Sequence, residues 1–87
     1  MYKELIAEFL GTMFFILAVV KTGNGFEIGT TLAVIIFLFN KTSGANFNPA
    51  VTVAKTLIGK QKPHMLIPYV IMQLLGVGAA LIISKHV

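Results

Sequence analysis

The residues best suited to chemistry lie at 43–52, which read Ser-Gly-Ala-Asn-Phe-Asn-Pro-Ala-Val-Thr. Asn48, Pro49 and Ala50 predict a helix start, because Asn caps free N–H groups and proline needs no N–H at the first helical position. Apolar stretches flank this segment on both sides. A helix that begins inside a membrane is tolerated only where its backbone is buried in protein or lines a watery cavity. The segment therefore indicates a pore.

Two kinds of group in this segment are expected to contact a permeating molecule. The NH₂ group of Asn48 would donate to a passing water, and the positive end of the helix dipole would repel cations. Backbone carbonyls of Gly44, Ala45 and Asn46 would replace the hydrogen bonds that water loses in a narrow passage. The simpler alternatives are an ordinary helix cap at Asn48 and an ordinary turn before it.

A carboxyl group, Glu8, lies inside the first apolar stretch, and intramembrane carboxyls mark functional sites by default. We expect Glu8 to accept hydrogen bonds from backbone N–H groups of the segment at 43–52 and to hold that segment in place. The competing interpretation is a carboxylate that titrates in a proton-coupled exporter. Thr12, Tyr69 and Gln73 are polar enough to brace the same segment, or else make ordinary interhelical hydrogen bonds.

The composition indicates a membrane protein. Hydrophobic residues make up 56% of the chain and charged residues 11%, whereas soluble domains carry about 25% charged residues. The net charge of +4 is too scattered for a nucleic-acid surface. The chain has no cysteine, and His64 and His86 stand far apart, so we expect no metal site and no cofactor. No nucleophile–base pair or phosphate loop is evident, so we do not expect an enzyme.

Three apolar blocks predict membrane-spanning helices. They cover about residues 5–20, 26–40 and 64–84. A lysine precedes the first block, as in a signal peptide, but the block contains Glu8 and no A-x-A-like cleavage site follows. Residues 49–57 predict a short helix of about 14 Å, which enters a membrane half-way or lies against it. We expect an all-α membrane protein in which residues 1–87 form a single unit.

Residue spacing predicts particular faces on two of these helices, and on the second block it predicts close helix packing. Gly29 and Ala33 are four residues apart, the spacing of a small-xxx-small face. In the last block, one helix face is expected to carry Tyr69, Gln73, Gly76 and Ala80.

Lysine placement predicts the orientation of the chain. A three-span arrangement puts five lysines on one side and two on the other. The larger group is Lys3, Lys41, Lys55, Lys60 and Lys62, and the smaller is Lys21 and Lys85. By the positive-inside rule, the N-terminus and the Asn-Pro-Ala loop are expected in the cytoplasm.

Taken together, these motifs resemble the aquaporin family, also called the major intrinsic proteins, over nearly the whole chain. Residues 7–12 resemble that family's first helix, and residues 43–52 its first signature loop. Tyr69-x-x-x-Gln73-x-x-Gly76 resembles its third helix. The resemblance implies half of an inverted-repeat fold, with three transmembrane helices and one re-entrant half-helix, and a loop-bracing role for the buried Glu.

The chain departs from the family pattern at several points. The second Asn-Pro-Ala loop is missing, as is the arginine of the family's constriction, and the chain has no arginine at all. Asn46 stands where the family usually has His. Ile28 occupies the pore-lining position where water-selective members commonly carry an aromatic residue.

Half of such a fold cannot enclose a pore. A second half is therefore expected, either in cis as part of a longer product, in trans from another chain, or as an inverted homodimer, so we expect an oligomer. The expected function is passive conduction of water or small neutral solutes across a lipid bilayer. Two alternatives stay open: a small proton-coupled exporter that uses Glu8, and a non-conducting fragment or regulatory partner of full-length channels.

Overall fold

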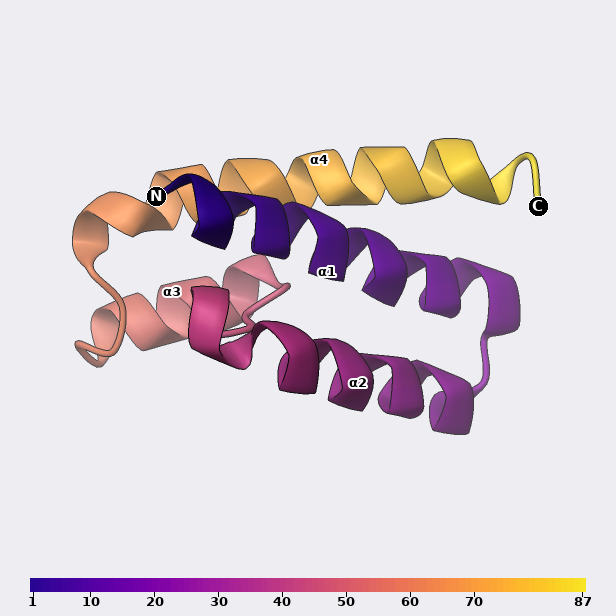
Figure 1. Cartoon of the computed structure of the whole chain (residues 1–87), viewed down its shortest axis with the longest axis horizontal. Coiled ribbons are helices and arrows are strands. Elements are labelled where there is room, and N and C mark those ends of the chain that lie inside the picture. The colour runs from indigo at the N-terminus through magenta and orange to yellow at the C-terminus, as the bar shows by residue number, and fades with distance from the viewer.

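The computed structural model describes residues 1–87 and is helical throughout apart from short connections (Figure 1). The three long helices are α1 (Tyr2–Thr22), α2 (Gly25–Ser43) and α4 (Leu66–Ser84). The short helix α3 (Pro49–Leu57) lies between α2 and α4 in the sequence, and a 3₁₀ turn (Pro63–Met65) precedes α4. The all-α fold class is confirmed.

The helix ends follow from local chemistry. Gly23, with φ of 58°, ends α1, and its N–H donates to the Val19 carbonyl oxygen over 3.2 Å. Asn24 then caps α2, because its Oδ1 accepts the N–H of Glu27 at 3.0 Å. Gly44, with φ of 86°, ends α2. Helices α1 and α2 extend beyond the predicted blocks at 5–20 and 26–40, because polar residues continue each helix as far as these caps, whereas α4 begins two residues inside the block at 64–84.

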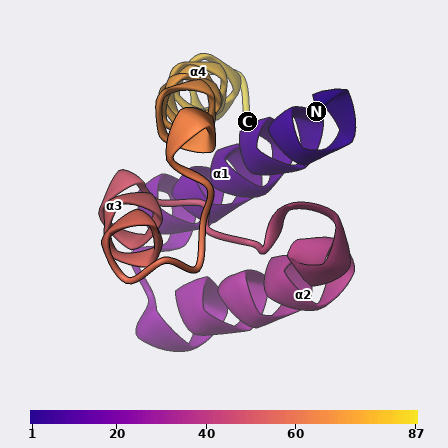
Figure 2. The same ribbon diagram turned by 90° about the vertical axis from the view of Figure 1, so that its left-hand side faces the viewer.

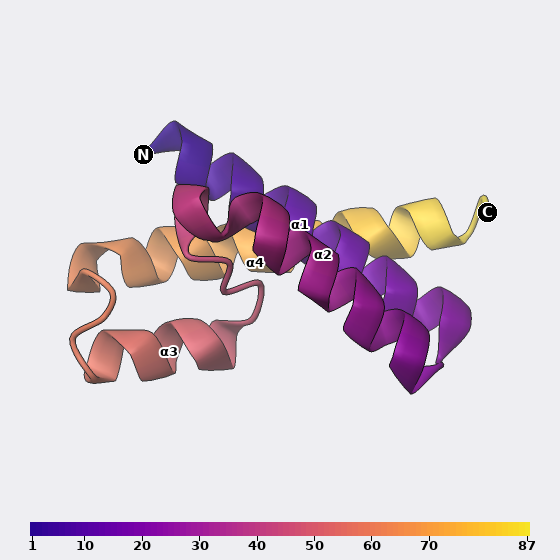
Figure 3. The same ribbon diagram turned by 60° about the horizontal axis from the view of Figure 1, so that its bottom comes forward.

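Helix α1 is the central helix and contacts both α4 and α2 (Figures 1 and 3). Helices α1 and α2 run in opposite directions, whereas α1 and α4 run the same way and cross each other (Figure 3). Seen end-on, α3 lies beside α4, and the chain before α3 passes through the space between the helices (Figure 2).

Close packing of α1 on α4 depends on a glycine. A Cβ at Gly76 would lie 2.7 Å from the Phe9 carbonyl oxygen and 3.0 Å from the Thr12 Cβ. The predicted face of α4 is the buried one, and its buried residues are Tyr69, Gln73, Gly76 and Ala80. Gly29 behaves differently, since nothing lies within 4 Å of a Cβ placed there. Its small-residue face has no partner helix within this chain.

Three helical segments are long and apolar enough to cross a membrane, Tyr2–Thr22, Gly25–Ser43 and Pro63–Ser84. The N-terminus lies at the same end of the molecule as the connection between α3 and α4, and the C-terminus lies at the opposite end (Figure 1). Helix α3 starts near the middle of the molecule's length and runs toward the N-terminal end (Figures 1 and 3). The structure therefore has three long apolar helices and one short helix that starts between their ends.

Candidate pore-lining site

The segment that leads into α3 has an unusual backbone. Gly44, Ala45 and Phe47 have φ values of 86°, 52° and 57°. The last two are costly for residues with a Cβ, since side chains crowd the backbone in the left-handed region. Such a conformation persists only where the surrounding structure holds it in place. The buried carboxyl group of Glu8 is the main source of that restraint.

Glu8 has no exposed surface, and its carboxyl group accepts four hydrogen bonds. Oε2 accepts from Asn46 N at 3.1 Å and from Ser43 Oγ at 2.7 Å. Oε1 accepts from Phe47 N and from Gln73 Nε2, both at 2.8 Å. A carboxylate offers about four acceptor sites, and all four meet a donor here. Helix α1 is thereby joined to α2, to the loop and to α4.

A hydroxyl on α3 forms a second junction. Thr52 is fully buried, and its Oγ1 accepts from Gln73 Nε2 at 2.8 Å and from Asn46 Nδ2 at 3.0 Å. The same hydroxyl lies 3.2 Å from the Asn48 carbonyl oxygen, to which it donates. Gln73 therefore bridges Glu8 and Thr52, which fixes the start of α3 against α4.

Ser43 and Tyr69 hold the beginning of the loop. The Tyr69 hydroxyl donates to the Ser43 carbonyl oxygen at 2.6 Å. Ser43 Oγ accepts the N–H of Ala45 at 3.1 Å while it donates to Glu8. The last residue of α2 is thus tied to both α1 and α4.

Phe47 anchors the loop in the apolar core. Its side chain is 1% exposed and packs with Ile35 and Ala45. The ring meets Phe39 edge-on, with centroids 6.1 Å apart. Gly11 lies directly beneath this ring, and a Cβ there would overlap the ring atoms. The loop is therefore held by packing as well as by hydrogen bonds.

Two predicted site residues lie outside this network. The buried Thr12 hydroxyl has no hydrogen-bond partner, and Thr12 instead lies against Gly76. Ile28 is half-buried in the first turns of α2, at the end of the molecule far from the loop. Gln73 Oε1 is also buried without a partner, although its amide nitrogen makes two hydrogen bonds.

Asn48, Pro49 and Ala50 start α3 as the sequence predicts. Asn48 Oδ1 accepts the N–H of Ala50 at 2.7 Å, and Pro49 takes the first helical position. Asn48 and Pro49 are half-buried, and Ala50 is exposed. The amide nitrogen of Asn48 donates to no atom of the chain, so its two N–H groups are free at the start of the half-helix.

Some of the backbone carbonyl groups of the loop are also free of hydrogen bonds. Those of Ala45 and Asn46 accept no hydrogen bond within the chain, whereas that of Gly44 accepts from Lys55 Nζ at 2.9 Å. The Asn46 side chain is engaged at both ends, since Nδ2 donates to Thr52 and Gln61 while Oδ1 accepts from Lys55 at 2.7 Å. The backbone carbonyl of Asn46 is its one oxygen that accepts no hydrogen bond within the chain.

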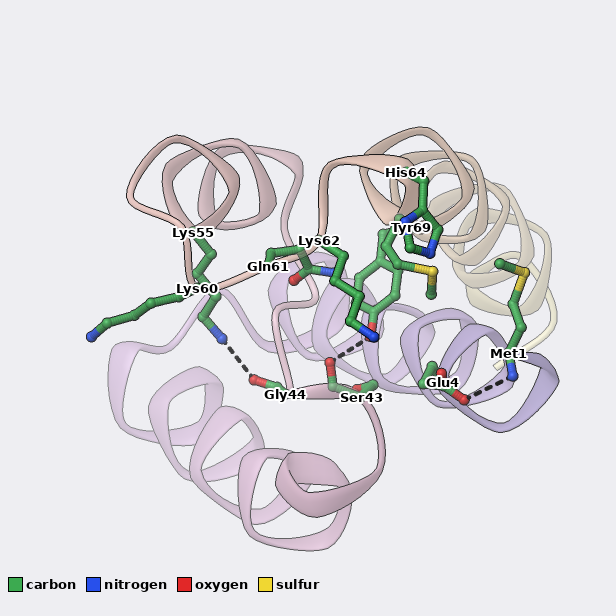
Figure 4. Close-up of a pocket in the computed structure, with 11 residues that line it drawn as sticks. Met1, Glu4, Ser43, Gly44, Lys55, Lys60, Gln61, Lys62, His64 and Tyr69 are labelled. Atoms are coloured by element: carbon green, nitrogen blue, oxygen red, sulfur yellow. Dashed lines mark hydrogen bonds and ion pairs between the residues drawn. The ribbon is translucent and has the colours of Figure 1, made fainter.

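An open cavity of about 400 Å³ lies beside the loop at the N-terminal end of the molecule (Figure 4). Ser43, Gly44, Gln61 and Tyr69 contribute to its wall. The Lys55 side chain points toward Gly44, whereas Lys60 points away from the cavity (Figure 4).

Several contributors to the site were not predicted from the sequence, namely Ser43, Phe47, Thr52, Lys55 and Gln61. Thr52 follows Asn48 by four residues and Lys55 follows Thr52 by three, spacings that place side chains on one helix face. That signal was present in the sequence. No cluster of three metal-ligating side chains occurs in the structure.

Comparison with known proteins agrees with this geometry. The whole chain, residues 1–87, matches the family described as major intrinsic protein. The chain belongs to the major intrinsic protein family. With its three apolar helices, this membership makes it an integral, multi-pass membrane protein.

Within the major intrinsic protein family, the chain is similar to several curated aquaporins. It is 38% identical to Aquaporin-8 of Rattus norvegicus over 91% of this chain and 35% of the relative. It is 34% identical to Aquaporin NIP1-1 of Arabidopsis thaliana, over 85% of this chain and 30% of the relative. The chain is 33% identical to Aquaporin Z of Brucella melitensis, over 92% of this chain and 42% of the relative. The chain thus spans less than half of each relative. No solved structure gives a significant match.

Proposed function

We propose that this chain forms one half of a channel that passively conducts water or small neutral solutes, and that a second half completes the pore. The observation that carries the proposal is the free amide nitrogen of Asn48 at the start of α3, near the middle of the molecule. A donor at that place would bind the oxygen of a permeating molecule. The dipole of α3 would add a positive potential at the same point.

The loop before Asn48 supports the proposal. Free carbonyls of Ala45 and Asn46 supply acceptors next to the free Asn48 donors. A molecule that moves along this row exchanges hydrogen bonds with water for hydrogen bonds with the protein, which lowers the barrier to permeation. We propose that Gly44, Ala45, Asn46, Asn48, Pro49 and Ala50 line the pore.

The contacts of Glu8 argue against a proton-coupled exporter. All four of its hydrogen bonds have Glu8 as the acceptor. Protonation would place an O–H against existing donors and release part of the loop. We propose that Glu8, Tyr69 and Gln73 brace the loop through their hydrogen bonds and that Thr12 contributes by packing under Gly76.

The solute class depends on the residues that the two halves bring to the constriction. The curated relatives are named aquaporins, but this sequence contains no arginine, and Ile28 is not aromatic. In an inverted pair, a constriction built from two copies of this chain would have neither an arginine nor an aromatic residue at position 28, and it would be wider or less polar than a filter for water alone. Small neutral solutes such as glycerol should pass at least as readily as water.

The second half has three possible sources: the same chain in a longer product, another chain, or an inverted second copy. An inverted pair would bring two Asn48 side chains face to face. We propose that the N-terminus and the loop are cytoplasmic, because five lysines lie toward that end and two toward the other. This charge bias favours one orientation and works against the inverted pair.

The test is osmotic swelling of vesicles that contain the purified chain, with water and with glycerol. We expect permeability above that of empty vesicles for both water and glycerol only where the chain pairs as an inverted dimer or with a complementary half, because a single copy cannot enclose a pore. Conduction by a demonstrated monomer would contradict the proposal. Permeability equal to that of empty vesicles, with correctly inserted protein, would show that the chain does not conduct alone and would leave it as a fragment or a non-conducting partner.

A further inference from the structure

We infer that Lys55 is a fixed positive charge on the conduction path, which excludes cations, protons included, while neutral solutes pass. This inference rests on the proposed function, since a charge filter needs a path to act on.

The ammonium group of Lys55 is held in place beside the loop. Nζ donates to the Gly44 carbonyl oxygen at 2.9 Å and to Asn46 Oδ1 at 2.7 Å. The Lys55 side chain is half-buried. Its ammonium group is therefore more restricted in position than that of an exposed lysine. Gly44 is directly followed by the free carbonyls of Ala45 and Asn46. The charge therefore lies at the start of the acceptor row.

No carboxylate neutralises this charge. Lys55 takes part in no ion pair, and the one ion pair in the structure joins the N-terminal amine to Glu4 at the helix start. Glu8 is buried and already accepts from four other donors. An unpaired ammonium repels an approaching cation strongly where little water screens it.

The cavity beside the loop leads to Lys55. Its basic lining residues are Lys55, Lys60, Lys62 and His64, whereas Glu4 is its one acidic lining residue. Among the lysines, Lys55 reaches the loop backbone and Lys60 points away (Figure 4). The cavity wall includes both Lys55 and Gly44, the residue directly before the two free carbonyls.

Neutral solutes are not excluded by the same group. An ammonium has three N–H donors, and Lys55 uses two of them on Gly44 and Asn46. The third can donate to the oxygen of water or of an alcohol. Lys55 is therefore expected to discriminate by charge without closing the path.

The test compares four proteins in vesicles: the unmodified chain, Lys55→Gln, Lys55→Arg and Lys60→Gln. Glutamine keeps an N–H donor and removes the charge, arginine keeps the charge, and Lys60→Gln removes a nearby lysine charge that does not reach the loop. Water and glycerol swelling measures neutral conduction. A pH-sensitive dye inside the vesicles measures proton leak under a potassium gradient clamped with valinomycin.

We expect the unmodified chain, Lys55→Arg and Lys60→Gln to swell without proton leak above that of empty vesicles. Lys55→Gln should swell at least as fast and leak protons at least about tenfold faster, which corresponds to about 1.4 kcal/mol. Lys55→Met is a second neutral variant in case Lys55→Gln does not fold.

Normal swelling of a neutral variant without proton leak would overturn the role of Lys55 and leave the proposed function standing. Absence of swelling by the inserted, unmodified chain once it is paired with a second half would overturn the proposed function, and with it the filter. Failure of both neutral variants to fold, with Lys55→Arg folded, would make Lys55 a bracing residue only and would also overturn the inference.

Discussion

A single carboxyl group, Glu8, joins three helices and the loop through four hydrogen bonds. Two of its donors are the backbone N–H groups of Asn46 and Phe47, which have no other hydrogen-bond partner. A buried donor without a partner costs about 1–3 kcal/mol. The positive φ values at Ala45 and Phe47 add strain that this network must offset.

Glu8→Gln should therefore lower stability. The amide NH₂ replaces an acceptor oxygen and would face two donors, which costs about 2–6 kcal/mol at ~1–3 kcal/mol for each donor. Folded yield after detergent extraction, measured by size-exclusion chromatography, should fall well below that of Glu27→Gln. Glu27 is exposed in the first turn of α2 and provides a matched control.

Equal folded yields for Glu8→Gln and Glu27→Gln would be at odds with a bracing carboxylate. Proton-coupled uptake that is lost in Glu8→Gln at normal protein levels would instead favour an exporter.

At this scale, the sequence could predict which residue types matter but not all of their partners. Glu8 and Gln73 stand out because polar groups in apolar helices are rare. Their contact joins residues 65 positions apart, and only the crossing of α1 and α4 brings them together. Thr12 looks equally polar in sequence, yet its hydroxyl has no hydrogen-bond partner, because that position faces Gly76.

Among the helices, the contact between α1 and α4 depends on a single missing Cβ. Gly76 lets the backbone of α1 approach, whereas a Cβ placed on Gly78, two residues later, would have nothing within 4 Å. These two glycines lie on the same helix and differ only in the face they occupy. Replacing each by Ala therefore separates the cost of a close contact at Gly76 from the gain in helix propensity at Gly78.

Gly76→Ala should destabilise the protein by about 1–3 kcal/mol, the usual cost of overpacking. Gly78→Ala should leave stability unchanged or raise it by up to about 1 kcal/mol, since Ala forms helix better than Gly. Thermal unfolding in detergent, followed by circular dichroism, measures both. A Gly76→Ala protein as stable as Gly78→Ala would show that α1 and α4 do not meet as described.

The sequence predicted these elements well but not which small residues pack. The apolar blocks and the Asn-Pro cap indicated three long helices and one short one. Gly29 and Gly76 both have small residues four positions away, Ala33 and Ala80, so periodicity alone treats them alike. Only α4 has its small face against α1, because the fold leaves the Gly29 face of α2 without a partner.

On the scale of the whole molecule, the geometry is that of half a channel. The amide nitrogen of Asn48 and the carbonyls of Ala45 and Asn46 have no hydrogen-bond partner within this chain. The chain also spans less than half of each curated relative described above. We therefore expect the pore between this chain and a second half, along the surface where α3 begins.

The most direct test of a pore at the start of α3 uses the absence of cysteine from the chain. Ala50→Cys puts a single small thiol on the exposed first turn of α3 and leaves Asn48 intact. Phe37→Cys, at a side chain that is 85% exposed on α2, is the control. Both variants are placed in vesicles, and water permeability is measured before and after a thiol reagent that attaches a bulky group.

We expect the reagent to reduce the permeability of Ala50→Cys vesicles to that of empty vesicles and to leave Phe37→Cys vesicles unchanged. Full permeability after complete modification at residue 50 would contradict a conduction path past the start of α3.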